Sequence, residues 1–256
     1  MHQVKFRDSA GVVRTGELDG DEVSFGRQRY DSSEVTMMAP VEPSKIICVG
    51  LNYLDHAEET NSEIPERPLL FIKTPNTVAA PGSTVHLPDK DRIDYEAELG
   101  VVIGSQCRNV SAEQADEVIA GYTCVNDISN RTDQRVEQNW VRGKAFDNAA
   151  PMGPVLATPD ELPKDASISL SINGESKQDS TIDNLIFSIP ELIQEITAMI
   201  TLEPGDVIST GTPAGVGPLS GGDKVTVTIE GIGTLSHDVV AGEFSGPIEH
   251  NFMPNL

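Results

Sequence analysis

The chain of 256 residues carries 40 acidic against 18 basic residues, which gives a formal net charge of −22 at pH 7. That charge disfavours nucleic-acid and membrane partners, and no apolar stretch reaches the roughly 20 residues of a membrane-spanning helix. Because the N-terminus lacks the apolar region of a signal peptide, we expect a cytoplasmic protein, whose acidic surface reflects either a salt-rich cytoplasm or an ordinary acidic bacterial protein.

Residues 1–40 are mostly polar and are divided by turns. Short β-type runs at 4–6, 11–13 and 22–25 predict a small antiparallel β subdomain there. A Pro-containing linker at 38–44 leads into the main domain, residues 45–256, which opens with an apolar strand at 45–50. A chain of this length suits one large domain with a small appendage.

Strands dominate the main domain. They are predicted at 69–73, 84–87, 97–103, 121–126, 154–157, 167–173, 206–210, 223–230 and 234–240. Capping-box motifs at Ser111 and Ser188 predict two helices that end near residues 120 and 200, and a third helix is predicted over about 132–139. Because the strands do not alternate regularly with helices, we predict a mainly β fold with a few helices, of the α+β class. Three cysteines without CxxC spacing indicate buried reduced thiols.

Two glutamates enter one of these apolar strands. Glu96 and Glu98 stand two positions apart before the run 99–103, and side chains two apart on a strand share a face. Carboxylates held that close are costly unless a cation or a proton lies between them, so the pair indicates a divalent-metal site. The alternative is a solvated strand face.

Asp127 follows the apolar strand at 121–126. If that strand neighbours the strand at 97–103, Asp127 completes a cluster of three carboxylates that suits Mg²⁺ or Mn²⁺. A turn or helix-capping role is the alternative for this residue.

Other candidate groups lie outside the carboxylate cluster. His56 and Glu59, three apart on a predicted helical turn, are either a proton-transferring pair or solvated side chains, and the polar segment 57–67 predicts a mobile loop or lid. Lys144, which follows Gly143, either stabilises a developing oxyanion or is a surface lysine. The glycine-rich loop 209–217 offers hydroxyls and backbone N–H groups to an anion.

Taken in order, these stretches resemble the fumarylacetoacetate hydrolase family. The matching segments are 50–59, 68–73, DYEAELG at 94–100, 121–127, GKAFD at 143–147, 187–190 and TGTPAGVG at 210–217, which together cover roughly residues 45–240. Ala145 is a mild departure, because the family often has glycine there. The resemblance implies a mixed β-sandwich roll around a divalent cation, usually in a homodimer.

The resemblance also implies a role for each candidate residue. Glu96, Glu98 and Asp127 would bind Mg²⁺ or Mn²⁺; His56, Glu59 and Lys144 would be catalytic; Arg131, Gln134, Thr212 and Gly211 would contact the substrate.

The implied reaction is hydrolysis of a C–C bond in a small-molecule 2-oxo or 2,4-dioxo acid, through a metal-stabilised enolate, as in acylpyruvate or fumarylpyruvate hydrolases. We rank two other reactions of the same site slightly below hydrolysis. They are isomerisation of 2-hydroxyhepta-2,4-diene-1,7-dioate and decarboxylation of the oxaloacetate type. A metal-binding protein without turnover is the alternative of another class, and the presence of both His56 and Glu59 disfavours it.

Overall fold

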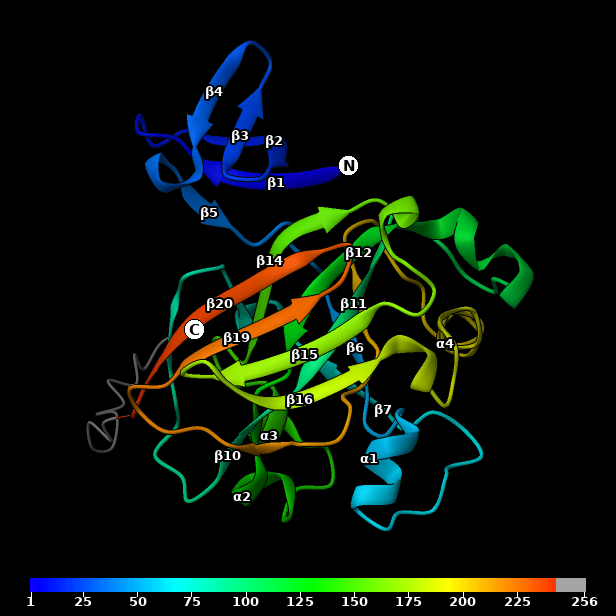
Figure 1. Ribbon diagram of the computed structural model, residues 1–256. Helices are drawn as coiled ribbons and strands as arrows, with labels where there is room; N and C mark the ends of the chain where they lie inside the picture. Colours follow the sequence, from blue (N-terminus) through cyan, green and yellow to red (C-terminus); the bar gives the residue numbers. More distant parts are fainter. Residues whose placement is uncertain (243–256) are drawn as a thin grey trace, which may run out of the picture.

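Two packed β-sheets form the body of the protein (Figure 1). The computed structural model describes residues 1–242. The larger sheet contains β1 (His2–Arg7), β2 (Val13–Asp19), β3 (Glu22–Phe25), β4 (Gln28–Asp31), β5 (Thr36–Met38), β6 (Ile46–Val49), β7 (Leu70–Lys73), β8 (Val78–Ala79), β11 (Ala97–Ile103), β12 (Ile119–Asn126), β14 (Ala150–Ala157) and β17 (Val207–Ser209). Its main path runs β4-β3-β2-β1-β14-β12-β11-β17-β6-β7, with β5 paired to β1 and β8 to β14.

The smaller sheet lies across the front of the larger one in Figure 1. It consists of β9 (Thr84–His86), β15 (Ser167–Ile172), β16 (Glu175–Thr181), β19 (Lys224–Ile229) and β20 (Gly233–Val240), in the order β16-β15-β19-β20-β9. A three-stranded sheet, β13-β10-β18, joins β10 (Ile93–Tyr95), β13 (Ser129–Asn130) and β18 (Gly217–Pro218).

Helices are few and short. They are α1 (Leu54–Glu59), α2 (Arg131–Gln134), α3 (Val141–Lys144) and α4 (Ile189–Thr197), with 3-10 turns η1 (Ser32–Glu34), η2 (Pro75–Thr77), η3 (Ala112–Val118), η4 (Pro159–Glu161) and η5 (Ile182–Asn184). The predicted mainly β fold with few helices is therefore confirmed. All three cysteines are free and buried, also as predicted.

Strand β11 lies at the centre of the fold, and all of its residues are buried. Leu99, Val101 and Ile103 pack into the core between the two sheets, whereas Val102 packs into a second, smaller core on the opposite face of the larger sheet. A strand covered on both faces reads as a continuous apolar run, which explains why residues 99–103 do not alternate with polar residues. Strand β11 pairs antiparallel with β12, and Ala97 lies opposite Asn126.

The N-terminal residues form the predicted antiparallel meander, β1 to β4, which stands at the top of Figure 1. Strand β1 also pairs antiparallel with β14, where His2 lies opposite Ala157. The meander therefore continues the large sheet through backbone hydrogen bonds, and the domain boundary near residue 40 stays a prediction.

Two helix predictions need correction. The segment after Ser111 is the 3-10 turn η3, not an α-helix, and its Ser111 hydroxyl contacts the side chain of Gln114 (3.3 Å) instead of capping a backbone N–H. The helix predicted over 132–139 exists only as α2, which ends at Gln134. The box at Ser188 does cap a helix, α4. Strand β16 was not predicted because it is an edge strand and is mostly polar and exposed.

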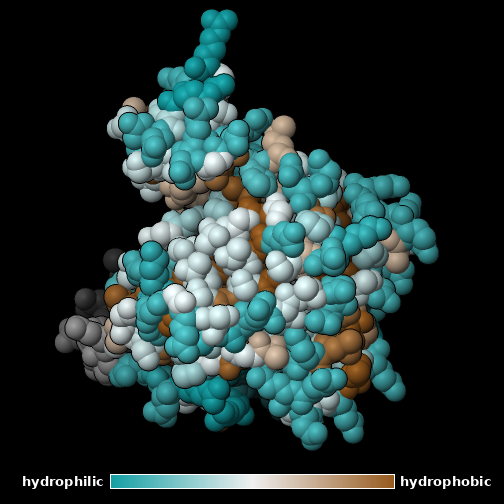
Figure 2. Space-filling view, in the orientation of Figure 1, coloured by the Kyte–Doolittle hydropathy of each residue, from teal (hydrophilic) through white to brown (hydrophobic). Residues whose placement is uncertain are grey.

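The face of the molecule in Figure 2 is mostly hydrophilic, as the charge leads one to expect, with an apolar patch at the lower right near α1. Exposed apolar side chains in that region include Leu54 and Ile64. Within residues 1–242, no helix is long and apolar enough to cross a bilayer.

Candidate active site

Three buried carboxylates meet where β11 begins and β12 ends. Glu96 precedes β11, Glu98 lies within it, and Asp127 follows β12. The pairing of these strands brings the three side chains together, and each offers an oxygen within 4.8 Å of the others. Their exposed fractions are 6%, 1% and 0%. The structure thus brings together the three residues that the sequence indicated as metal ligands.

Lys144 lies among these carboxylates. Its Nζ donates to Glu96 Oε2 and Asp127 Oδ2, both at 2.7 Å, and lies 4.7 Å from the centre of the Phe71 ring. Helix α3 can bring this lysine in because Gly143 packs against α2, where a side-chain carbon would lie 3.0 Å from the backbone of Gln134. Lys144 is 2% exposed, so it is a residue of the site and not a surface lysine.

A second buried lysine, Lys73 at the end of β7, fixes the floor of the site. Its Nζ donates to the carbonyls of Ile128, Lys144 and Ala149, at 3.2, 2.6 and 2.9 Å. The same ammonium group forms a buried ion pair with Asp127 Oδ1, at 2.7 Å.

The electrostatics of the cluster favour a cation. Burial raises the pKa of Glu98 well above its ordinary value of 4.5, and the neighbouring charges of Asp127 and Glu96 raise it further. Burial would also raise the pKa of Glu96, but Lys144 and Arg131 outweigh it and lower the pKa. An all-oxygen donor set that includes one carboxyl resisting ionisation fits a hard divalent cation, which would favour the charged form of that carboxyl.

The glycine-rich loop supports the metal-ligand candidates directly. The hydroxyl of Ser209 and the backbone N–H of Gly211 both donate to Glu98 Oε2, at 2.5 and 3.1 Å. Gly211 has φ +97°, and a Cβ there would lie 2.8 Å from Cβ of Asn52. Thr212 is buried, and its hydroxyl accepts from Gln178 Nε2 at 2.8 Å. The structure therefore places Gly211 in a hydrogen bond with Glu98, whereas Thr212 is hydrogen-bonded to Gln178.

Helix α1 carries the predicted proton-transferring pair. His56 Nδ1 and Glu59 Oε2 lie 3.3 Å apart, and both Glu59 oxygens accept from the backbone N–H of Gly215, at 3.2 and 3.1 Å. Asp55, beside His56, accepts from Ser180 Oγ at 2.6 Å. These contacts join α1 to the glycine-rich loop and to β16, so the pair is held at the edge of the site.

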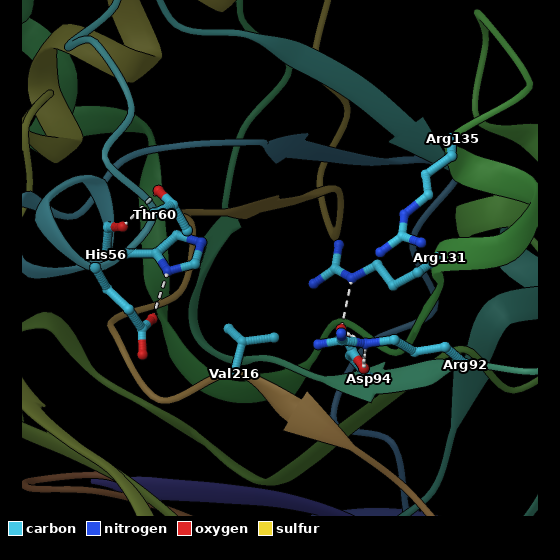
Figure 3. A pocket seen from close by; sticks show the side chains of 8 residues that line it. His56, Thr60, Arg92, Asp94, Arg131, Arg135 and Val216 are labelled. Atoms are coloured by element: carbon cyan, nitrogen blue, oxygen red, sulfur yellow. Dashed lines mark hydrogen bonds and ion pairs between the residues drawn. The ribbon is translucent and has the colours of Figure 1, made fainter.

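A cavity of about 360 Å³ lies between α1 and α2 (Figure 3). His56 and Glu59 form one side and three arginines the other. Arg131 connects the cavity to the carboxylate cluster, because its guanidinium donates both to Asp94 Oδ2 (2.9 Å) and to Glu96 Oε1. Gln134 accepts from Arg131 (2.8 Å) and so orients it.

The match to known proteins agrees with this geometry. Residues 45–240 match the model of the fumarylacetoacetate (FAA) hydrolase C-terminal family. The chain belongs to this family. Members of the family are enzymes, and the resemblance seen in the sequence is thereby confirmed.

Individual relatives within the fumarylacetoacetate hydrolase family differ in activity. Oxaloacetate tautomerase YisK from Bacillus subtilis is 44% identical over 84% of this chain and 76% of its own. The crystal structure of 5-carboxymethyl-2-hydroxymuconate delta-isomerase from Mycobacterium smegmatis is 38% identical, with a TM-score of 0.87 over 95% of this chain and 100% of its own. Maleylpyruvate hydrolase from Sphingobium sp. SYK-6, in complex with manganese(II) and pyruvate, is 28% identical, with a TM-score of 0.81 over 95% and 100%.

Some residues of this site were not singled out from the sequence. Lys73 stands at the end of an apolar strand, and a charged residue closing such a run was the available signal. Asn126 Oδ1 accepts a hydrogen bond from the backbone N–H of Glu96 (2.9 Å). Asn126 Nδ2 lies 2.9 Å from Nε2 of His237, which is buried in β20. That contact joins residues 111 positions apart, so no local pattern could indicate it.

Proposed function

We propose that the protein is a divalent-metal-dependent enzyme that forms the enolate of a 2-oxo acid and moves a proton on it, with Mg²⁺ or Mn²⁺ held by Glu96, Glu98 and Asp127. The observation that carries this proposal is the buried carboxylate cluster, linked through Arg131 to a cavity that also contains His56 and Glu59. A relative whose structure contains manganese and pyruvate supports the choice of cofactor and of substrate class.

The cation would act as a Lewis acid on the oxygens of the 2-oxo acid. Lys144 supplies a buried positive charge beside the cluster: burial would lower its pKa, but Asp127 and Glu96 outweigh that effect and raise it. Lys144 therefore stays protonated and can stabilise a developing oxyanion without giving up its proton. Arg131, fixed by Asp94 and Gln134, would orient the carboxylate of the substrate.

His56 and Glu59 are the groups that would move the proton. Their side chains lie 3.3 Å apart, close enough to exchange a proton. They face Arg131 across the cavity. In enol–keto tautomerisation or isomerisation the pair transfers a proton between carbon and oxygen. In hydrolysis it would activate a water molecule, after which the C–C bond breaks and releases the same enolate.

We place tautomerisation or isomerisation first and C–C hydrolysis second. This order reverses the one favoured by the sequence, because the tautomerase and the isomerase are 44% and 38% identical to this chain and the hydrolase 28%. Hydrolysis remains the second candidate because a histidine paired with a glutamate is suited to activating water.

An assay with Mg²⁺ or Mn²⁺ present tests the proposal. Oxaloacetate, an acylpyruvate and a 2-hydroxydienoate are supplied in turn, and the products identify tautomerisation, isomerisation, hydrolysis or decarboxylation. We expect Glu59→Gln to lower kcat about 100-fold or more. The matched control is Glu58→Gln, whose exposed side chain lines a different cavity. Equal rates for the two variants would refute the role of Glu59, and no turnover of any 2-oxo acid would refute the function.

We further propose that the protein is a homodimer. Strand β7 is an edge of the large sheet, and Leu69 and Ile72 beside and within it are 49% and 51% exposed. Val141 on α3, which contacts β7, is also exposed. Apolar groups gathered on an edge strand favour burial against a second copy. Light scattering during gel filtration would give the mass, and a monomer at micromolar concentration would contradict the proposal.

A further inference from the structure

The edge strand β16 of the smaller sheet contains one buried polar side chain, Gln178. Every other residue of β16 is at least partly exposed, whereas Gln178 is 1% exposed. Strand β16 pairs with β15 (Figure 1), and the register of that pairing shifts beside this residue, since Leu170 lies opposite Gln178 but Ser171 lies opposite Ser176. Irregularities of this kind re-aim side chains, and they are frequent next to active sites. Here the side chain directed into the protein is Gln178.

The side-chain amide of Gln178 forms hydrogen bonds in two directions. Its Oε1 accepts from the backbone N–H of Ala97 at 2.9 Å. Its Nε2 donates to the hydroxyl of Thr212 and to the carbonyl of Pro213, at 2.8 and 2.9 Å. Both amide protons are thereby occupied, so Gln178 holds two segments of the protein together and does not donate to a substrate.

These two segments carry different parts of the site. Ala97 stands between the two glutamates of the carboxylate cluster. The glycine-rich loop holds the other part, because its Gly215 N–H donates to both oxygens of Glu59, at 3.2 and 3.1 Å. Gly215 also lies directly against β16, since a Cβ there would be 2.1 Å from the carbonyl oxygen of Lys177. One buried amide therefore connects the strand of the metal-ligand candidates to the loop that holds Glu59.

We infer that Gln178 is a positioning residue that sets the placement of the His56–Glu59 pair relative to the carboxylate cluster. This inference rests on the proposed function, since the cluster is taken to bind the cation and the pair to move the proton. Gln178 acts through Ala97 on the metal ligands and through the glycine-rich loop on Glu59. A displacement of about 1 Å between reacting groups can cost about 100-fold in rate, so loss of this amide should reach the chemistry.

Gln178→Met tests the inference, because methionine keeps the length of the side chain and removes all three hydrogen bonds. The substrate is whichever 2-oxo acid the unmodified protein converts fastest, at saturating metal. We expect kcat to fall about tenfold or more with KM within about threefold, and the metal Kd, from a titration of Tm, to rise about threefold or more. In the metal-free variant, the Gly215 amide should exchange faster with deuterium.

Thr197→Val is the matched control. Thr197 is fully buried in α4, which lines no part of the cavity, and its hydroxyl accepts from the backbone N–H of Val110 at 3.0 Å. This variant should lose stability but keep kcat, the metal Kd and the exchange of Gly215. If Gln178→Met does not fold, Gln178→Glu replaces it, with kcat and the exchange of Gly215 as its readouts. Glutamate keeps the acceptor for Ala97 and can donate at most one of the two bonds to the loop.

The outcomes separate this inference from the proposed function. If Gln178→Met changes kcat or the metal Kd no more than Thr197→Val does, the inference is overturned while the proposed function stands. A rise in KM with unchanged kcat would also overturn it, since Gln178 would then act on substrate binding. If the unmodified protein binds metal but turns over no 2-oxo acid, the proposed function fails, and the metal Kd with the exchange of Gly215 decides the inference. If it binds no metal, both fail together.

Discussion

Replacing Glu98 by glutamine separates two contributions to the free energy of unfolding: that of the carboxylate cluster itself and that of metal binding to it. Burial and the neighbouring charges of Asp127 and Glu96 raise the pKa of Glu98 well above 4.5, so its neutral form is favoured without metal. Glutamine is neutral too, and its oxygen can accept the same bonds from Ser209 and Gly211. Without metal, we therefore expect Glu98→Gln to change the free energy of unfolding by less than about 1 kcal/mol.

With metal, the two proteins should differ. A cation at 100 times its Kd stabilises the unmodified protein by about 2.7 kcal/mol. For a chain of this size, that corresponds to a rise in Tm of about 5–10 °C. Glu98→Gln loses one anionic ligand and should show little of this rise.

The assay is thermal unfolding in EDTA and in a Mg²⁺ or Mn²⁺ series, with Glu58→Gln as the control. The folded-state pKa of Glu98 lies above its unfolded value, so its contribution to the stability of the metal-free protein is full below about pH 4 and decreases as pH rises through the folded pKa. Metal binding must displace that proton, so affinity should increase with pH. A metal-free Glu98→Gln protein that loses several kcal/mol, or one that keeps the full metal-induced rise in Tm, would refute this reasoning.

Three further predictions concern residues around the cluster. Lys73→Met should destabilise the protein by about 4 kcal/mol or more in urea unfolding, because three carbonyls lose their donor and Asp127 loses a neighbouring charge; a loss below about 1 kcal/mol would contradict this account. Burial lowers the pKa of His237 to about 4, so the unfolded state takes up a proton between pH 6.5 and 4, and stability should fall by about 3 kcal/mol as pH decreases through that range. His237→Asn should lack that dependence, and identical pH profiles would count against it. Gly211→Ala should lower both stability and metal affinity, because φ +97° is unfavourable for alanine and its Cβ would lie 2.8 Å from Asn52; metal titration monitored by Tm would detect the change, and unaltered affinity would show that the loop does not support Glu98.

The carboxylate cluster could be predicted because its parts are local. Glu96 and Glu98 are two apart before one apolar strand, Asp127 follows another, and only the pairing of β11 with β12 had to be assumed. The predicted strands mostly recur within a few residues, since apolar runs bounded by glycine are sufficient to specify them. The helix predicted over 132–139 was wrong in length, because α2 ends at Gln134 and the chain then turns at Trp140 into α3.

Other parts of the site depend on contacts between distant residues. Lys73 reaches carbonyls 55 to 76 positions away, and Asn126 meets His237 across 111 positions. No local pattern encodes such pairings, because they are set by how the two sheets and α2 pack.

The three carbonyls held by Lys73 belong to the segments that contain Asp127 and Lys144, and the ammonium group ties these segments together before any ligand arrives. The floor of the site is thereby preorganised, and binding a cation there requires little loss of backbone entropy. Helix α1 is held more lightly, through contacts of Glu59 and Asp55 with the glycine-rich loop and Ser180. Amide hydrogen exchange should therefore be slow at residues 128 and 149 with or without metal, whereas protection of α1 should increase only when a substrate analogue fills the cavity.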